Sequence, residues 1–249
     1  PGDAAARLIG QLGRYSDLRD GHIREWAHLW ERFDIAFEDN PDAMRVVRLH
    51  LLQLLQTVPN GAVDLDAGLP ARGLHGEAYR GHIFWDELFV FPLLNLRLPV
   101  LTRSMLDYRF RRLVRARAAA RRAGHAGAMF PWQSGSDGRE ETQRLHLNPR
   151  SGRWLPDNSR LQRHINIAVA YNAWSYYQVT GDIEFLRFRG APMIIEIARF
   201  LAGLATYDAS DDRYDVIGVM GPDEYHDGYP DAEVPGLDNN AYTNVMTVW

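Results

Sequence analysis

The amino-acid sequence predicts an all-α fold in which pairs of helices form a wall and long loops gather at one end. Apolar residues recur at spacings of three and four along most of the chain, as on one face of an amphipathic helix. Two long stretches, 60–86 and 124–158, are instead rich in glycine, proline and turn residues. Strand-like alternation is confined to at most a short β-hairpin near residues 214–219, so nothing indicates a parallel sheet. We therefore expect a helical toroid that carries its functional residues on loops.

The composition restricts the chemistry. The chain has 249 residues, no cysteine, and 28 basic against 32 acidic side chains, and every basic residue is arginine. These counts exclude disulfides, cysteine-ligated metals and Schiff-base chemistry on lysine. No apolar run reaches the roughly 18 residues of a membrane span, and the sequence opens without an apolar leader. We expect a cytoplasmic protein that does not engage a membrane.

The helices can be assigned in order along the chain. Residues 3–37 carry apolar repeats typical of packing helices. Asn40 is the expected N-cap of the next helix, with Pro41 in its first turn, and this helix ends before Pro59. The remaining helices are expected over 87–97, 98–122, 161–180, 182–205 and 239–249, the first two being separated around Pro99.

Residues 218–228 carry the densest chemical signal. Asp223 and Glu224 are adjacent carboxylates in a rigid Gly-Pro turn, flanked by Tyr225 and His226. Such a turn can hold one carboxyl group in a partly desolvated position, where its pKa rises enough for it to donate a proton. Glu224 has the longer reach and is the candidate general acid. The structural alternative is that Asp223 caps the turn and Glu224 is a surface charge.

A metal site in the same segment is the weaker interpretation. Asp223, Glu224, His226 and Asp227 are all metal-ligand types, but four of them within five residues cannot converge on one ion without a suitable register. We expect no metal.

Aromatic and carboxylate side chains recur together on other loops. Trp85 can stack on the C–H face of a sugar ring while the carboxylate of Asp86 accepts hydrogen bonds from its hydroxyls. The alternative is a buried tryptophan with Asp86 as a helix N-cap. Trp132, followed by Glu140, repeats the combination. Together with residues 218–228, these are three loops that combine aromatic and carboxylate side chains, and they predict a carbohydrate site.

A helix crowded with arginine raises a different possibility, a nucleic-acid surface. The residues are Arg109, Arg111, Arg112, Arg115, Arg117, Arg121 and Arg122. They point to several faces of the helix, and the formal net charge of the chain is −4. We therefore expect a solvated outer wall that uses arginine for solubility, and no nucleic-acid partner.

The chain resembles the central catalytic domain of glycoside hydrolase family 65, which includes maltose, trehalose and kojibiose phosphorylases. The resemblance extends from about Trp26 to the last residue, in the family's order. It rests on Ala-Arg-Gly-Leu at 71–74, Tyr-Arg-Gly-His-Ile-Phe-Trp-Asp at 79–86, Pro-Trp at 131–132, Gly-Arg-Glu at 138–140, Gln-Arg-His-Ile-Asn at 162–166, Thr-Gly-Asp at 180–182, Ala-Arg-Phe at 198–200, Gly-Pro-Asp-Glu-Tyr-His at 221–226 and Asn-Asn-Ala-Tyr-Thr-Asn at 239–244.

The resemblance implies an (α/α)6 barrel that cleaves an α-linked glucose disaccharide with inversion. Glu224 would protonate the glycosidic oxygen, and Trp85 with Asp86 would hold the non-reducing glucose. In phosphorylases, inorganic phosphate is the co-substrate and β-glucose 1-phosphate leaves, with no other cofactor. Further substrate contacts are expected from Trp132, Glu140, His164, Asp223, Tyr225, Asn239 and Asn240.

The same resemblance defines the expected organisation. About six or seven helices are expected where such a barrel has about twelve, so residues 41–249 would form its N-terminal half, after a helical linker at residues 1–40. The phosphate site and any catalytic base are then expected beyond Trp249. We expect the isolated chain to be inactive, and a homodimer is possible for the full-length protein. The alternatives are an inverting hydrolase, which needs a second carboxylate about 6.5–9.5 Å from the acid, and a non-catalytic carbohydrate-binding fragment.

Overall fold

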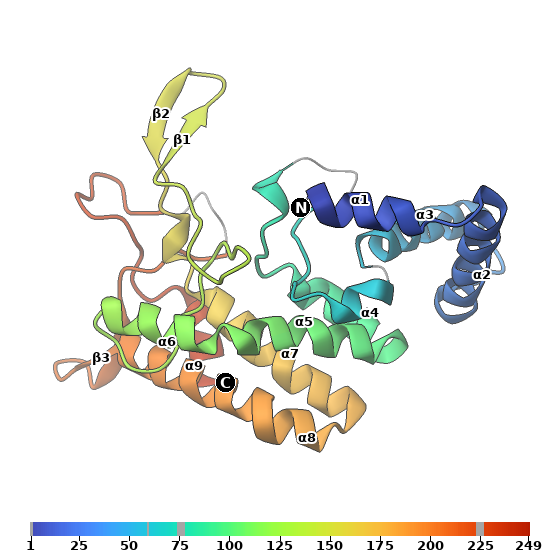
Figure 1. Cartoon of the computed structure of the whole chain (residues 1–249). Helices are drawn as coiled ribbons and strands as arrows, with labels where there is room; N and C mark the ends of the chain where they lie inside the picture. The colour runs from blue at the N-terminus through green and yellow to red at the C-terminus, as the bar shows by residue number, and fades with distance from the viewer. Residues whose placement is uncertain (1, 59, 74–77, 223–226) are drawn as a thin grey trace. The chain divides into compact units, whose positions relative to one another are not determined.

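The chain is described by a computed structural model that covers residues 2–58, 60–73, 78–222 and 227–249 (Figure 1). By packing, it divides into two compact units, Pro1–Leu54 and Leu55–Trp249. This division concerns packing alone, and the expected start of a catalytic domain at residue 41 stays a prediction. Within the described ranges, no helix combines the length and apolar character that a bilayer crossing requires.

The first unit is helical. It contains α1 (Gly2–Gln11), α2 (Tyr15–Phe33) and most of α3 (Pro41–Thr57). The predicted cap is confirmed, because the Asn40 side chain accepts a hydrogen bond from the Ala43 backbone N–H at 2.9 Å. Two hydrogen bonds from Arg48 to the carboxylate of Asp34, at 2.6 and 2.5 Å, tie the end of α2 to α3.

The second unit is mostly helical as well, which agrees with the expected class. Its α-helices are α4 (Glu87–Arg97), α5 (Pro99–Arg111), α6 (Leu113–Arg122), α7 (His164–Thr180), α8 (Ile183–Phe185), α9 (Ala191–Leu204) and α10 (Ala241–Val248). Short 3-10 turns lie at η1 (Asn60–Asp64), η2 (Tyr79–Gly81) and η3 (Ser159–Leu161), and a π-helical turn, η4 (Leu186–Gly190), joins α8 to α9.

Helix α7 forms the centre of this unit. It packs against α4, α5 and α9, and Figure 1 shows α5, α7 and α9 side by side. Ten of its seventeen residues are buried, so it lacks the polar stripe of a surface helix. Its first residue, His164, is fully buried. Helix α7 therefore begins with a titratable side chain that lies in the core.

The predicted helix over 98–122 is wrong in one respect, because it breaks at Arg112. The backbone of Arg112 leaves the helical region at φ −96° and ψ 3°, and its N–H donates to the carbonyl of Arg109 instead of continuing the α-helical pattern. The guanidinium of Arg112 is engaged with residues of two distant loops. Helical propensity gives no sign of this break, because those contacts are tertiary.

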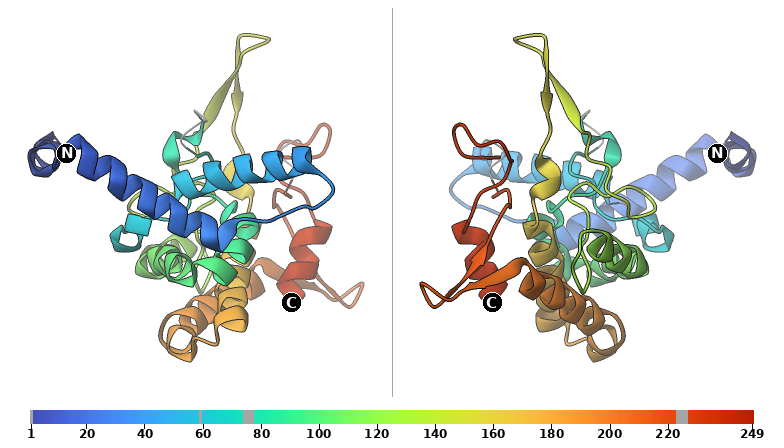
Figure 2. Two further views of the ribbon diagram at one scale, coloured as in Figure 1. Left: turned by 90° about the vertical axis from the view of Figure 1, so that its right-hand side faces the viewer. Right: turned by 90° about the vertical axis from the view of Figure 1, so that its left-hand side faces the viewer.

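The structure has two β-hairpins where at most one was expected near 214–219. Strand β3 (Ala205–Asp208) pairs antiparallel with β4 (Arg213–Val216), so this hairpin begins and ends earlier than predicted. Strands β1 (Leu145–Asn148) and β2 (Arg153–Pro156) form another hairpin inside the predicted loop 124–158. Figure 2 shows this hairpin projecting from the helices. Its strands have four residues each and few of their side chains are shielded from solvent, so the alternation of Leu145 and Leu147 with polar residues is too short to have marked a strand in the sequence.

The expectation that all seven arginines form a solvated wall is wrong for two of them. Arg109 and Arg112 are buried, with 1% and 8% exposure. They are three residues apart on α5 and at its end, so they face the same side. Inside the unit, their guanidinium groups donate hydrogen bonds to residues of the loops.

A fully buried ion pair joins α4 to α5. The Arg109 guanidinium lies 2.9 Å from the Glu87 carboxylate and also donates to the carbonyl of Phe84 at 2.8 Å. The same carboxylate faces the backbone at residue 68, where a Cβ on Gly68 would lie 2.7 Å from Oε1 of Glu87. Glycine is required there by this close approach. One ion pair thus fixes two helices and two loop segments.

Removing one partner of this pair should destabilise the fold strongly. Arg109→Met leaves a buried carboxylate uncompensated, and we expect a loss of about 3–5 kcal/mol in the free energy of unfolding, measured by urea denaturation. Arg115→Met is the matched control, because Arg115 is exposed, and it should cost less than about 0.5 kcal/mol. Equal losses in the two variants would contradict a structural role for the pair.

Candidate functional site

A cavity of about 590 Å³ lies among the loops of the second unit. We call it the loop cavity. It is lined by residues of three segments, 79–84, 132–146 and 156–159, together with Met220 and Asp227. Met220 and Asp227 lie on either side of Glu224, the predicted general acid, in the sequence. Asp223, Glu224 and Tyr225 themselves lie outside the described residues.

Glu140 holds one wall of the loop cavity. Its carboxylate accepts hydrogen bonds from the backbone N–H groups of Trp132 and Gln133, at 2.8 and 3.0 Å, and from the hydroxyl of Thr142 at 2.5 Å. This carboxylate therefore shapes the turn that presents Trp132. Direct contact of Glu140 with a substrate stays a prediction.

Three of the predicted site residues form one aromatic cluster. The ring centroid of Trp85 lies 4.7 Å from His164 and 6.3 Å from Trp132, and the centroids of Trp132 and His164 are 5.1 Å apart. Tyr242 of α10 contacts the cluster at 6.0 Å from His164, edge to face. Tyr242 is not among the predicted site residues, although it lies in the same motif as Asn239 and Asn240. Residues from four distant segments thus meet, as a site built on loops requires.

His164 is neutral in this environment. Its ring is fully buried, and neither nitrogen makes a hydrogen bond of standard geometry with the described residues. Burial lowers the pKa of His164 to about 4, although the backbone of Met220 opposes the shift. A neutral imidazole keeps one N–H donor and one acceptor, so it can exchange hydrogen bonds with a polar ligand.

Asp86 carries a carboxylate without a side-chain partner among the described residues. It occupies the N-cap position of α4, as the structural alternative expected, but its side chain makes no capping hydrogen bond. It is half-buried, and burial raises the pKa of this carboxyl group. Among the described residues, no arginine or histidine lies within ion-pairing distance of it. A desolvated carboxylate next to Trp85 can accept hydrogen bonds from a polar ligand.

The two asparagines before α10 have internal partners. Asn240 caps α10 by accepting a hydrogen bond from the Thr243 N–H at 3.1 Å. Asn239 has a positive φ of 55° and donates to the Asp215 carboxylate at 2.7 Å. Their side chains hold the chain near residues 215–221, where a Cβ on Gly221 would lie 2.4 Å from the Asn240 amide. A role in substrate binding stays a prediction for both.

The match to known proteins decides the family. The family model described as the glycosyl hydrolase family 65 central catalytic domain matches residues 48–249. The chain belongs to glycosyl hydrolase family 65. The resemblance seen in its motifs is thereby confirmed, and the aromatic cluster lies within the matched region.

Proteins of several bacteria are similar in sequence to the chain. A glycosyl hydrolase of Mycobacterium tuberculosis without an assigned activity is 61% identical over 99% of the chain, which spans 18% of that protein. Trehalose 6-phosphate phosphorylase of Lactococcus lactis is 45% identical over 94% of the chain, which spans 30% of that protein. Kojibiose hydrolase of Flavobacterium johnsoniae is 36% identical, with 98% of the chain and 33% of that protein covered. The family thus includes phosphorylases and a hydrolase among these relatives.

A solved structure has a similar fold. A protein from the human microbiome described as a candidate kojibiose phosphorylase superposes with a TM-score of 0.78 over 94% of the chain and 28% of that protein, at 25% sequence identity. The mostly helical fold with two small sheets is therefore a family 65 arrangement.

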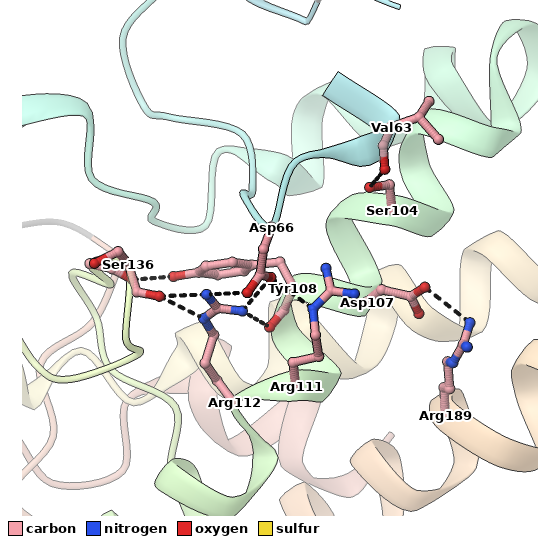
Figure 3. Close-up of polar contacts among 10 residues, drawn as sticks. Val63, Asp66, Ser104, Asp107, Tyr108, Arg111, Arg112, Ser136 and Arg189 are labelled. Atoms are coloured by element: carbon pink, nitrogen blue, oxygen red, sulfur yellow. Dashed lines mark hydrogen bonds and ion pairs between the residues drawn. The ribbon is translucent and has the colours of Figure 1, made fainter. Parts of the chain in front are cut away.

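A second polar network anchors the loops of this family 65 chain (Figure 3). The guanidinium of Arg112 lies 3.8 Å from the centroid of the Tyr108 ring and donates to the carboxylate of Asp66 at 2.6 and 2.9 Å. It also donates to the carbonyl of Ser136. The Tyr108 hydroxyl donates to the carbonyl of Gly135 at 2.5 Å. This network joins loop 60–86 to loop 124–158, and the sequence analysis missed it because its members are far apart in the chain.

The buried imidazole should make stability depend on pH. The pKa of His164 is about 4 in the folded chain and about 6.5 in an unfolded one. The unfolded state therefore binds a proton that the folded state does not, and stability is lost as the pH falls from about 6.5 to 4, by about 3 kcal/mol at most. Urea denaturation across this range should show the loss in the native chain and a smaller one in His164→Phe.

His28→Gln is the control for this measurement. His28 is exposed, so its replacement should leave the pH dependence as it is in the native chain. An unchanged pH slope in His164→Phe would show that the imidazole is not held neutral by burial.

Proposed function

We propose that the chain carries the glucose-binding residues and the general acid of an inverting α-glucoside phosphorylase, with Glu224 as the acid. The observation that carries this proposal is the carboxylate of Asp86, half-buried and without a protein partner among the described residues, next to the aromatic cluster of Trp85, Trp132 and His164. The apolar ring faces can stack on the C–H face of a sugar ring, and the carboxylate beside them can accept hydrogen bonds from its hydroxyls. Membership of family 65 and the names of its phosphorylases support the reaction class.

The reaction needs one proton donor and one nucleophile on opposite faces of the sugar. In the proposed step, Glu224 gives its proton to the glycosidic oxygen as the bond from that oxygen to the anomeric carbon breaks. An oxygen of inorganic phosphate forms a new bond to the same carbon from the other face. The product is β-glucose 1-phosphate, and the second sugar leaves with the proton. Asp86 and the indole of Trp85 would hold the glucose during this displacement.

Two features of the chain favour Glu224 as the donor. Met220 and Asp227, on either side of its segment, line the loop cavity. The Asn240 side chain holds the start of that segment through its close contact at Gly221. The chain spans 18%, 30% and 33% of the lengths of the three relatives named above, and we propose that it is inactive on its own.

Hydrolysis is the second candidate function, because a kojibiose hydrolase is also similar to the chain. The two are separated by incubating the full-length protein with trehalose, trehalose 6-phosphate or kojibiose, with and without inorganic phosphate. Phosphate-dependent release of glucose 1-phosphate supports the phosphorylase. Release of free glucose at equal rates in both conditions would overturn it in favour of the hydrolase.

Removing the acid should abolish turnover while leaving binding intact. Glu224→Gln in the full-length protein should lower kcat by roughly 10²–10⁴-fold, because the amide cannot donate the proton. The disaccharide Kd, measured by calorimetry, should stay within a few-fold of the native value. Normal turnover in this variant would refute the assignment, whereas weakened binding with unchanged kcat would make Glu224 a binding residue.

Removing the sugar-binding groups should have a different signature. Trp85→Ala should raise KM by about tenfold, through loss of the stacking surface. Asp86→Asn should lower kcat/KM by about ten- to a hundredfold, because a charged hydrogen-bond acceptor is lost. Trp154→Ala is the matched control, since Trp154 is 65% exposed on β2. An effect of Trp154→Ala as large as that of Trp85→Ala would contradict the proposed glucose site.

A further inference from the structure

A second cavity lies behind one wall of the loop cavity. It has a volume of about 730 Å³, and we call it the arginine cavity because Arg115, Arg122, Arg139, Arg144 and Arg160 line it. The only acidic residue among its described lining is Glu140. Five guanidinium groups against one carboxylate give a formal excess of four positive charges in a chain whose net charge is −4. Such a concentration of one sign in a concave site raises the local concentration of anions.

Most of this positive charge has no ion-pair partner in the described part of the chain. Arg139 pairs with Asp137 at 2.7 Å and with Glu141 at 3.4 Å. Arg115, Arg122 and Arg144 have no carboxylate within 4.0 Å among the described residues. These three come from two segments, α6 and the start of the β1–β2 hairpin, that converge on one cavity.

The remaining groups strengthen the field. The Glu140 carboxylate already accepts hydrogen bonds from the backbone N–H groups of Trp132 and Gln133. Arg160 donates to the carbonyl of Asp157 at 3.2 Å and has no carboxylate within 4.0 Å among the residues that the structure describes. Arg163, half-buried nearby, adds another guanidinium, whose pKa is lowered by burial and by the charge of Arg160.

The two cavities are lined by neighbouring residues of the same segments. In four pairs of sequence neighbours, one residue lines the loop cavity and the other lines the arginine cavity. With the residue of the loop cavity named first, the pairs are Trp132 and Pro131, Glu141 and Glu140, Gln143 and Arg144, and Ser159 and Arg160. Any ligand that fixes Arg144 and Arg160 therefore also fixes the residues that face the loop cavity.

We propose that the arginine cavity binds a phosphate-bearing ligand through Arg115, Arg122 and Arg144, and that the bound ligand stiffens the wall of the loop cavity. Guanidinium groups pair with phosphate through two parallel hydrogen bonds, and a phosphate monoester carries close to two negative charges. Three unpaired arginines can satisfy all of its free oxygens. A carboxylate ligand offers one charge and two oxygens, and fits this set less well.

Calorimetry on the full-length protein at constant ionic strength tests the site, with glucose 6-phosphate and inorganic phosphate titrated separately. Arg115→Gln/Arg122→Gln should weaken binding of the preferred probe by about tenfold or more relative to the native protein. Arg213→Gln is the matched control, because Arg213 is exposed on β4 and does not line either cavity, and it should bind as the native protein does. Phosphate bound at any other site contributes equally to all variants, so the difference reports the arginine cavity.

A second variant and a second ligand comparison complete the test. Arg144→Gln, on a loop, should also weaken binding, and it decides the question if the helix double variant does not fold. Tighter arginine-dependent binding of glucose 6-phosphate than of inorganic phosphate identifies a sugar phosphate as the ligand, and equal binding identifies free phosphate. Native-like affinity in both variants, or no binding by the native protein, overturns the proposal. Binding is measured without turnover, so this outcome is independent of the fate of Glu224.

Discussion

The buried pair of Glu87 and Arg109 is the constraint on which the site depends. Both side chains are 1% exposed, so neither charge can be left unmatched without a large cost in the free energy of unfolding. Because Arg109 also binds the carbonyl of Phe84, the pair fixes the chain immediately before Trp85 and Asp86. An apolar pair of the same volume could fill this space. It could not bind a carbonyl group, so it would leave Trp85 and Asp86 less well held.

Charged groups elsewhere in the unit serve the same purpose. Arg112 joins the two long loops through Asp66 and Ser136 (Figure 3), and Glu140 holds the turn at Trp132. With these anchors in place, and among the described residues, Asp86 has no ion-pair partner and the buried ring of His164 makes no hydrogen bond of standard geometry. Both states cost folding free energy, which is typical of residues kept for binding or catalysis. The loops are therefore ordered by arginine and carboxylate contacts that the aromatic cluster itself does not provide.

The sequence was most informative where a signal is local. The cap at Asn40, the break around Pro99 and the helix over 87–97 depend on residues within a few positions of one another, and the structure confirms them. The β1–β2 hairpin escaped notice because each strand has only four residues and lies mostly in solvent. The break at Arg112 escaped notice because its cause is a pair of loops 24 and 46 residues away in the chain.

The sequence by itself determined the mostly helical class, the family and a set of site residues, because hydrophobic periodicity and short motifs are properties of neighbouring residues. Only the tertiary structure decided which members of that set meet. It joined Trp85, Trp132 and His164 with Tyr242, left the Asp86 side chain without a capping hydrogen bond and turned Glu140 toward the backbone. It also separated seven similar arginines into two that are buried and five that are not. Burial and pairing depend on contacts between segments that are far apart in the chain, and only the folded structure shows which of these segments meet.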